Sequence, residues 1–165
     1  MNSSLTERQY NMSIATLAKT NGFYVGMFKI LDNDKMSFET DIDRKKSIAI
    51  GDLVYFMYVD GRLMKIGKTG DASGFYGRAG LYKRGLSASC KTNERIIRIM
   101  KSIDKREIAV YAIATPRKPV EVVCPLTGKI DTVYLKTADI HEKNLTKTYL
   151  NEDSSNELPL CKQLN

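Results

Sequence analysis

The alternation of apolar and polar positions divides this chain into short strand-like runs that are separated by turn residues. The clearest pair of runs covers residues 53–59 and 63–69, with Asp60 and Gly61 between them. Asp-Gly between two such runs is a strong hairpin signal, because both residues tolerate positive φ. The pattern therefore predicts a β-hairpin, and we expect Tyr55 on one strand to share a site with Lys65 on the next.

Two helices are predicted after this hairpin. Residues 71–85 contain four glycines, each of which costs about 1 kcal/mol relative to Ala inside a helix. In a helix, Arg78 and Tyr82 would share one face, because positions i and i+4 are neighbours; the alternative is a loop whose bare backbone approaches a ligand. Residues 92–103 form the clearest helical pattern, with Thr92 as the expected N-cap.

The other elements complete an α+β pattern. In chain order they are a helix over 1–20, a hairpin over 22–40, a buried strand over 107–114, a hairpin over 120–135 and a helix over 137–150 with Thr137 as a possible cap. An amphipathic helix fits 22–40 less well. We expect a small mixed or antiparallel central sheet flanked by helices. The polar segment 41–47 is taken as the boundary between an N-terminal extension, residues 1–47, and a core, residues 48–165.

Positive charge is concentrated in one segment that follows the first hairpin. Residues 78–118 hold eleven Lys or Arg and three acids, a local net charge of +8, whereas the whole chain carries +7. A solvated helix face is the plain interpretation of such a run. Because the excess lies beside the predicted Tyr55–Lys65 site, it also indicates a polyanionic partner.

Several classes of protein do not fit the sequence. No apolar run approaches the ~18 residues of a membrane helix, and residues 1–10 lack the layout of a signal peptide. The three cysteines, Cys90, Cys124 and Cys161, have no C-x-x-C spacing, which predicts a reduced, cytoplasmic protein without a zinc site or disulfide framework. One histidine, His141, excludes a His-rich metal site, and neither a phosphate-binding P-loop nor the acid-then-E-x-K pattern of many restriction enzymes is present.

The final predicted helix carries a carboxylate on its apolar face. Glu142 has Ala138 at i−4, Leu145 at i+3 and Tyr149 at i+7. A carboxylate on such a face points inward, where an unpaired charge is costly, so it needs a cation. That cation is either a Lys or Arg in an ordinary buried ion pair, or a metal ion.

At these residues the sequence resembles the GIY-YIG nuclease superfamily. Tyr55 matches the first tyrosine of that pattern, while Lys65 stands for the second and is followed by Ile66-Gly67. Arg78 matches the family arginine, Tyr82 the aromatic or histidine one turn later, and Glu142 the metal-binding glutamate. The change of the second Tyr to Lys, the short length and the closing hairpin plus helix resemble the small type II restriction endonucleases of this superfamily. The similarity spans residue 51 to the C-terminus.

The resemblance implies a sequence-specific, Mg²⁺-dependent endonuclease that cleaves double-stranded DNA as a homodimer. Glu142 would bind the metal, Arg78 the scissile phosphate, and Tyr55 would be the general base, its pKa lowered by Lys65. Tyr82 would hold the water, and Lys68 is either a phosphate ligand or a surface residue. The expected DNA-contacting residues are Lys83, Arg84, Lys91, Arg95, Arg98 and Lys101.

Other functions are left open by the sequence. Within the nucleases, the alternatives are a nicking, homing, phage or repair enzyme. From other classes, the alternatives are a non-catalytic DNA-binding module and a basic RNA-associated protein. The tyrosines also have a purely structural interpretation as core residues, since the chain contains nine of them.

Overall fold

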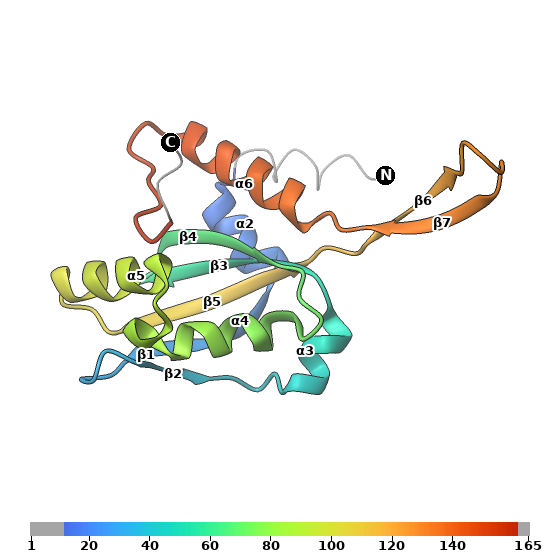
Figure 1. Ribbon diagram of the computed structural model, residues 1–165. Coiled ribbons are helices and arrows are strands. Elements are labelled where there is room, and N and C mark those ends of the chain that lie inside the picture. The colour runs from blue at the N-terminus through green and yellow to red at the C-terminus, as the bar shows by residue number, and fades with distance from the viewer. Residues whose placement is uncertain (1–11, 162–165) are drawn as a thin grey trace.

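The computed structural model describes residues 12–161 and shows an α+β fold (Figure 1). Five strands form an antiparallel sheet in the order β2-β1-β5-β3-β4, and two more form a separate hairpin. The strands are β1 (Phe23–Ile30), β2 (Met36–Glu39), β3 (Leu53–Val59), β4 (Arg62–Thr69), β5 (Glu107–Ala114), β6 (Lys118–Val123) and β7 (Ile130–Leu135). The helices are α2 (Ile14–Asn21), α3 (Arg44–Ile50), α4 (Gly74–Lys83), α5 (Lys91–Ser102), α6 (Ala138–Glu152) and the 3₁₀ helix η1 (Gly85–Ala88).

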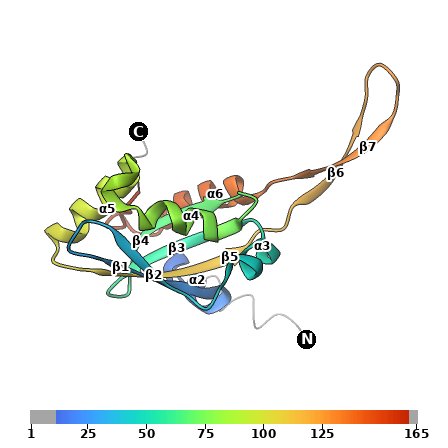
Figure 2. The ribbon, with the colours of Figure 1, turned by 60° about the horizontal axis from the view of Figure 1, so that its bottom comes forward.

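Strand β3 is buried on both faces, which explains its unbroken apolar run. Its odd-numbered residues, such as Tyr55 and Met57, pack in the cluster that includes residues of α4 and α5. Its even-numbered residues, such as Phe56, pack in a second cluster with residues of α2 and α6. Helices therefore cover both faces of the sheet, and β4 is an edge strand between α4 and α6 (Figures 1 and 2).

The first predicted hairpin is confirmed as β3 and β4. Asp60 and Gly61 both have positive φ, 47° and 78°, as the turn requires. The predicted hairpin over 22–40 is also confirmed, as β1 and β2. The predicted helix over 1–20 is present as α2 from Ile14, and residues 1–11 lie outside the described part of the chain.

One local prediction, the N-cap of α5, was wrong, and the contacts at two other predicted sites are more specific than the sequence indicated. The polar segment 41–47 contains the start of α3, where Asp43 caps the helix by accepting a hydrogen bond from the Lys46 amide at 2.8 Å. The predicted division between residues 47 and 48 falls inside this helix, and strands from both sides of it pair in one sheet. Thr92 is not the N-cap of α5, since that helix begins two residues earlier, after Cys90. Thr137 is the N-cap residue of α6, but its hydroxyl donates to the Pro116 carbonyl instead of capping the helix.

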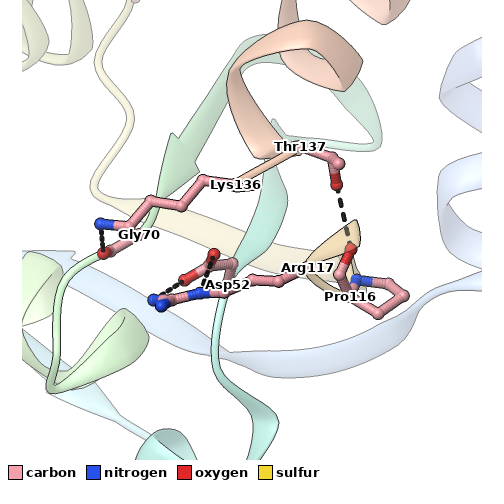
Figure 3. A network of polar contacts seen from close by, with 6 residues as sticks. All are labelled: Asp52, Gly70, Pro116, Arg117, Lys136 and Thr137. Carbon is pink, nitrogen blue, oxygen red and sulfur yellow. Dashed lines mark hydrogen bonds and ion pairs between the residues drawn. The ribbon is translucent and has the colours of Figure 1, made fainter. Parts of the chain in front are cut away.

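The hairpin β6–β7 extends away from the body of the molecule, and we call it the arm (Figure 2). Its two ends are fixed to the central sheet by the contacts drawn in Figure 3. The guanidinium of Arg117 donates two hydrogen bonds, of 3.0 and 3.3 Å, to the buried carboxylate of Asp52. At the other end the Lys136 ammonium donates to the Gly70 carbonyl at 2.7 Å. The arm and the start of α6 are thus tied to the ends of β3 and β4.

Among residues 12–161, no helix combines the length and the apolar character that crossing a membrane requires.

Candidate active site

The predicted catalytic residues line one pocket of about 190 Å³ at the β4 edge of the sheet. Its lining residues are Tyr55, Lys65, Gly67, Lys68, Arg78, Leu81, Tyr82, Cys90, Thr92 and Glu142. They come from β3, β4, α4, α6 and the start of α5, so the fold gathers residues separated by almost ninety positions in the sequence.

The two tyrosines of the pocket contact each other directly. The hydroxyl oxygens of Tyr55 and Tyr82 are 2.6 Å apart in a buried hydrogen bond, and each residue is 2 % exposed. Burial raises the pKa of Tyr55 well above its usual value of 10.0. Burial also raises the pKa of Tyr82, to about 12. Both phenols are therefore protonated at neutral pH in the free protein.

The predicted effect of Lys65 on Tyr55 was wrong. Lys65 pairs across the hairpin with Met57 instead of Tyr55, and burial lowers the pKa of its own ammonium. The cation that favours the phenolate form is Arg78, whose charge lowers the pKa of Tyr55 and of Tyr82 against the larger effect of burial. Arg78 acts on both phenols because α4 places it one turn before Tyr82, whose hydroxyl contacts that of Tyr55.

Gly67 allows Tyr55 to occupy the pocket. The two residues face each other across β3 and β4, and the aromatic ring lies over the bare Cα of the glycine. A Cβ at position 67 would lie 2.3 Å from Cζ of Tyr55 and 2.4 Å from its hydroxyl oxygen. Any larger residue would collide with the phenol, which gives a steric reason for glycine at this position of the K-I-G motif.

Helix α4 is held in place by Ser47, which the sequence did not indicate. Its hydroxyl donates to the Ser73 carbonyl at 3.0 Å and accepts from the Tyr76 amide at 2.9 Å. Ser47 lies in α3 and is 2 % exposed. This contact fixes the first turn of α4 and so positions Arg78 and Tyr82 farther along the same helix.

Glu142 is half-buried and lines the pocket from the α6 side. Burial raises the pKa of its carboxyl, while the positive charges of Lys68 and then Lys65 lower it. Lys68 itself is ion-paired with Asp139, which also accepts from Lys143 at 2.8 Å. In the described residues no direct hydrogen bond or ion pair to Glu142 is present, so its carboxylate is free to bind a cation.

The donor set is compatible with a magnesium ion. Mg²⁺ keeps several waters and binds proteins through one or two carboxylates together with substrate phosphates. Within residues 12–161 no three His, Cys, Asp or Glu side chains converge on one point. A single half-buried carboxylate facing a pocket that holds Arg78 and Lys65 fits a metal shared with a phosphate. It does not fit a site made by the protein alone.

The predicted DNA-contacting residues divide into two groups. Arg95 donates to the Pro159 carbonyl at 2.6 Å and Lys101 is ion-paired with Asp34, so both make contacts within the protein. The other four are exposed, and their side chains make no hydrogen bond or ion pair in the described part of the chain; they are Lys83, Arg84, Lys91 and Arg98.

No protein-family model matches this chain, and no curated protein matches its sequence. Two nucleases are among the solved structures that resemble its fold. The restriction endonuclease HPY188I in complex with product DNA is 16% identical with a TM-score of 0.52, and the match covers 97% of this chain and 91% of that one. A mutant of bacteriophage T4 EndoII is 15% identical with a TM-score of 0.54, covering 89% of this chain and 100% of that one. The chain therefore has a fold found in nucleases.

Proposed function

We propose that this protein is a Mg²⁺-dependent endonuclease of the GIY-YIG type that cleaves double-stranded DNA. The observation that carries the proposal is the shared pocket, in which Tyr55, Tyr82, Arg78, Lys65 and Glu142 converge. The two nuclease structures with the same fold support it. We further propose that the enzyme cuts at a specific sequence, as a type II restriction endonuclease does. A phage, homing or repair nuclease remains the alternative within the class.

The candidate catalytic residues of the pocket have separate proposed roles in phosphodiester hydrolysis. Arg78 binds the non-bridging oxygens of the scissile phosphate, for which a planar guanidinium is well suited. Its Nε is buried and has no hydrogen-bond partner in the described residues, so it is available to the substrate. Lys65, buried and cationic, adds positive charge as the phosphate gains negative charge. A divalent cation at Glu142 would act as a Lewis acid on the phosphate and the leaving oxygen.

Tyr55 is the proposed general base, in partnership with Tyr82. A phenolate on Tyr55 would accept the 2.6 Å hydrogen bond from the Tyr82 hydroxyl and lie near the charge of Arg78. The charge of Arg78 favours the ionised form of Tyr55, which then takes the proton of the attacking water, whereas burial and the neighbouring Tyr82 raise the pKa of Tyr55. Burial opposes ionisation, so we expect the reactive form to be populated at alkaline pH.

The candidate catalytic residues all lie after residue 47. We therefore keep the proposal that residues 48–165 carry the chemistry, while residues 1–47 extend the scaffold through β1, β2 and α2. A cytoplasmic location is proposed from the three cysteines, which are all free thiols.

The arm supports the proposed homodimer. An isolated two-stranded hairpin is at best marginally stable in water, yet this one exposes apolar side chains on both of its faces. They are Val122, Val123, Leu126, Ile130, Val133, Tyr134 and Leu135. Residues 118–135 carry two Lys and two acids, so the arm has no net charge, unlike the basic chain as a whole. An apolar, neutral surface suits a second copy of this chain better than a phosphate backbone.

Sedimentation tests this assignment of the arm. Replacing Val133 and Tyr134 by Glu would place like charges in the interface, and we expect a change from dimer to monomer. The exposed pair Arg62–Glu157 lies elsewhere, so Glu157→Gln serves as a control that stays dimeric. A wild-type protein that sediments as a monomer would contradict the homodimer.

The activity is tested by incubation with a mixed-sequence plasmid and Mg²⁺, with EDTA as the control. Discrete fragments that EDTA abolishes would support a site-specific nuclease, and their mapped ends would give the recognition site. A smear would contradict sequence specificity but not nuclease activity. Intact DNA with a salt-sensitive gel shift would contradict catalysis and favour a DNA-binding module.

A further inference from the structure

Helix α5 begins at the wall of the catalytic pocket, where Cys90 and Thr92 are lining residues. Cys90 is its N-cap, but the side chain makes no capping hydrogen bond. In the described part of the chain, no oxygen accepts a hydrogen bond from the N–H groups of Lys91, Thr92 or Asn93. The first turn of this twelve-residue helix thus presents its N–H donors beside the pocket, with only the Cys90 thiol near those of Thr92 and Asn93, together with the positive end of the helix dipole.

The side chain of Asn93 holds this first turn in position. It is 0 % exposed, and its Nδ2 donates to the Leu81 carbonyl at 2.9 Å and to the Gly85 carbonyl at 3.0 Å. Leu81 belongs to α4, the helix that carries Arg78 and Tyr82. The start of α5 is therefore fixed relative to the catalytic residues, and its donors need no rearrangement to meet a ligand in the pocket.

Two cationic side chains of the pocket favour an anionic ligand. Lys65 is 8 % exposed and lines the same pocket, and its ammonium makes no hydrogen bond or ion pair with any residue in 12–161. The buried Nε of Arg78 also lacks a partner there. Near the helix start, the N–H groups of Asn93 and Thr92 lower the pKa of the Cys90 thiol, as expected where negative charge is favoured.

We propose that the first turn of α5 binds a second phosphate of the DNA strand, adjacent to the phosphate that is cleaved. The inference rests on the proposed function and adds a subsite to it. Arg95 and Lys101, farther along α5, are engaged within the protein, so the parts of α5 that are free to meet the DNA are its first turn and the exposed side chains of Lys91 and Arg98. This placement is an established physical use of a helix N-terminus, where free N–H groups point at an oxyanion.

Two substitutions at Lys91 separate the backbone donor from the side-chain charge. Lys91→Gln removes the charge and keeps the N–H, whereas Lys91→Pro removes both. Proline fits here because position 91 is the first helical residue, and Cys90 before it has the extended backbone, φ −111° and ψ 119°, that proline requires. We expect Lys91→Pro to bind a short DNA duplex in EDTA about tenfold more weakly than Lys91→Gln.

Equal affinities of the two variants, both with the circular dichroism spectrum of the wild type, would overturn the inference while the proposed function stands. Failure of the wild type to bind any DNA would instead overturn the proposed function and the subsite with it. A measurement on the wild type avoids the substitutions altogether. The amide NMR signals of Lys91 and Thr92 should shift when the duplex is added in EDTA, and unmoved signals would refute the subsite.

Discussion

Replacing Gly67 by alanine would perturb the site at the place where its geometry is tightest. The added Cβ would lie 2.3 Å from Cζ of Tyr55, whereas ordinary van der Waals contacts begin at 3.4 Å. The obstructing atoms belong to a buried aromatic ring, not to the end of a flexible chain. The ring must therefore move by about 1 Å, and this displacement would break the 2.6 Å hydrogen bond between Tyr55 and Tyr82.

The magnitude follows from this displacement. Overpacking of this kind costs about 1–3 kcal/mol of stability, which thermal unfolding would measure as a lower Tm. Misplacing a reacting group by about 1 Å reduces the rate of catalysis roughly 10²-fold. We expect single-turnover plasmid cleavage to slow by about that factor, with little change in DNA affinity, because Gly67 lies on the wall formed by Tyr55.

Gly80→Ala is the matched control, since it adds the same methyl group to open space. No heavy atom lies within 4 Å of the Cβ that it would create, and the residue lies within α4. We expect an unchanged rate and a stability higher by about 0.5–1 kcal/mol, as for glycine replaced inside a helix. Equal cleavage rates for wild type and Gly67→Ala would refute the packing of Tyr55 on the glycine. The same packing would be refuted if Gly67→Ala slowed cleavage by an equal factor in the wild type and in a Tyr55→Phe background.

Two further predictions concern the proton that leaves the attacking water. Tyr55→Phe and Tyr82→Phe should each slow cleavage by about 10²-fold or more. Because the two hydroxyls act as a unit, the double variant should be little slower than Tyr55→Phe alone. Additive losses of rate, measured in single turnovers, would contradict this. Cleavage by the wild type should rise with pH over the whole alkaline range in which the fold is intact, because burial raises the pKa of Tyr55 well above 10.0 and the phenolate fraction increases with pH. At the acid side the rate should fall at a pH above 4.5, since burial raises the pKa of Glu142 and protonation would release the cation. A pH–rate profile that declines between pH 7 and 9 while circular dichroism shows the fold intact would refute the tyrosine assignment.

The sequence was most informative where local signals and burial agreed. The Asp60-Gly61 turn and its two apolar runs predicted β3 and β4 almost to the residue, because only the turn and the strand pattern decide that hairpin. The predicted hairpin over 22–40 succeeded for the same reason. Strand β5 was predicted with its exact bounds, Glu107–Ala114, since a charged residue and a pair of prolines enclose an apolar run.

Some features of the site could not be predicted from the sequence, chiefly because they depend on tertiary contacts. Asp43 and Ser47 were predicted only as part of a polar boundary. Asp43 caps α3 through the nearby Lys46 amide, whereas Ser47 fixes α4 through Ser73 and Tyr76, which are far away in sequence. The sequence predicted that Tyr55 and Lys65 share a site, but it did not predict how deeply the two side chains are buried. Burial has the largest effect on the pKa of both groups. Asn93, which ties α5 to α4, carried no signal because its partners are backbone carbonyls.

Glu142→Gln tests the central claim most directly, with Glu157→Gln as an isosteric control on the surface. If Glu142 binds the catalytic cation, Glu142→Gln should cleave no plasmid in Mg²⁺ and yet shift the same DNA on a gel. Burial raises the pKa of Glu142, so its charged form destabilises the fold at neutral pH, and Glu142→Gln should unfold at an equal or higher temperature. Glu157→Gln should cleave like the wild type. Cleavage by Glu142→Gln at the wild-type rate would contradict the proposed active site.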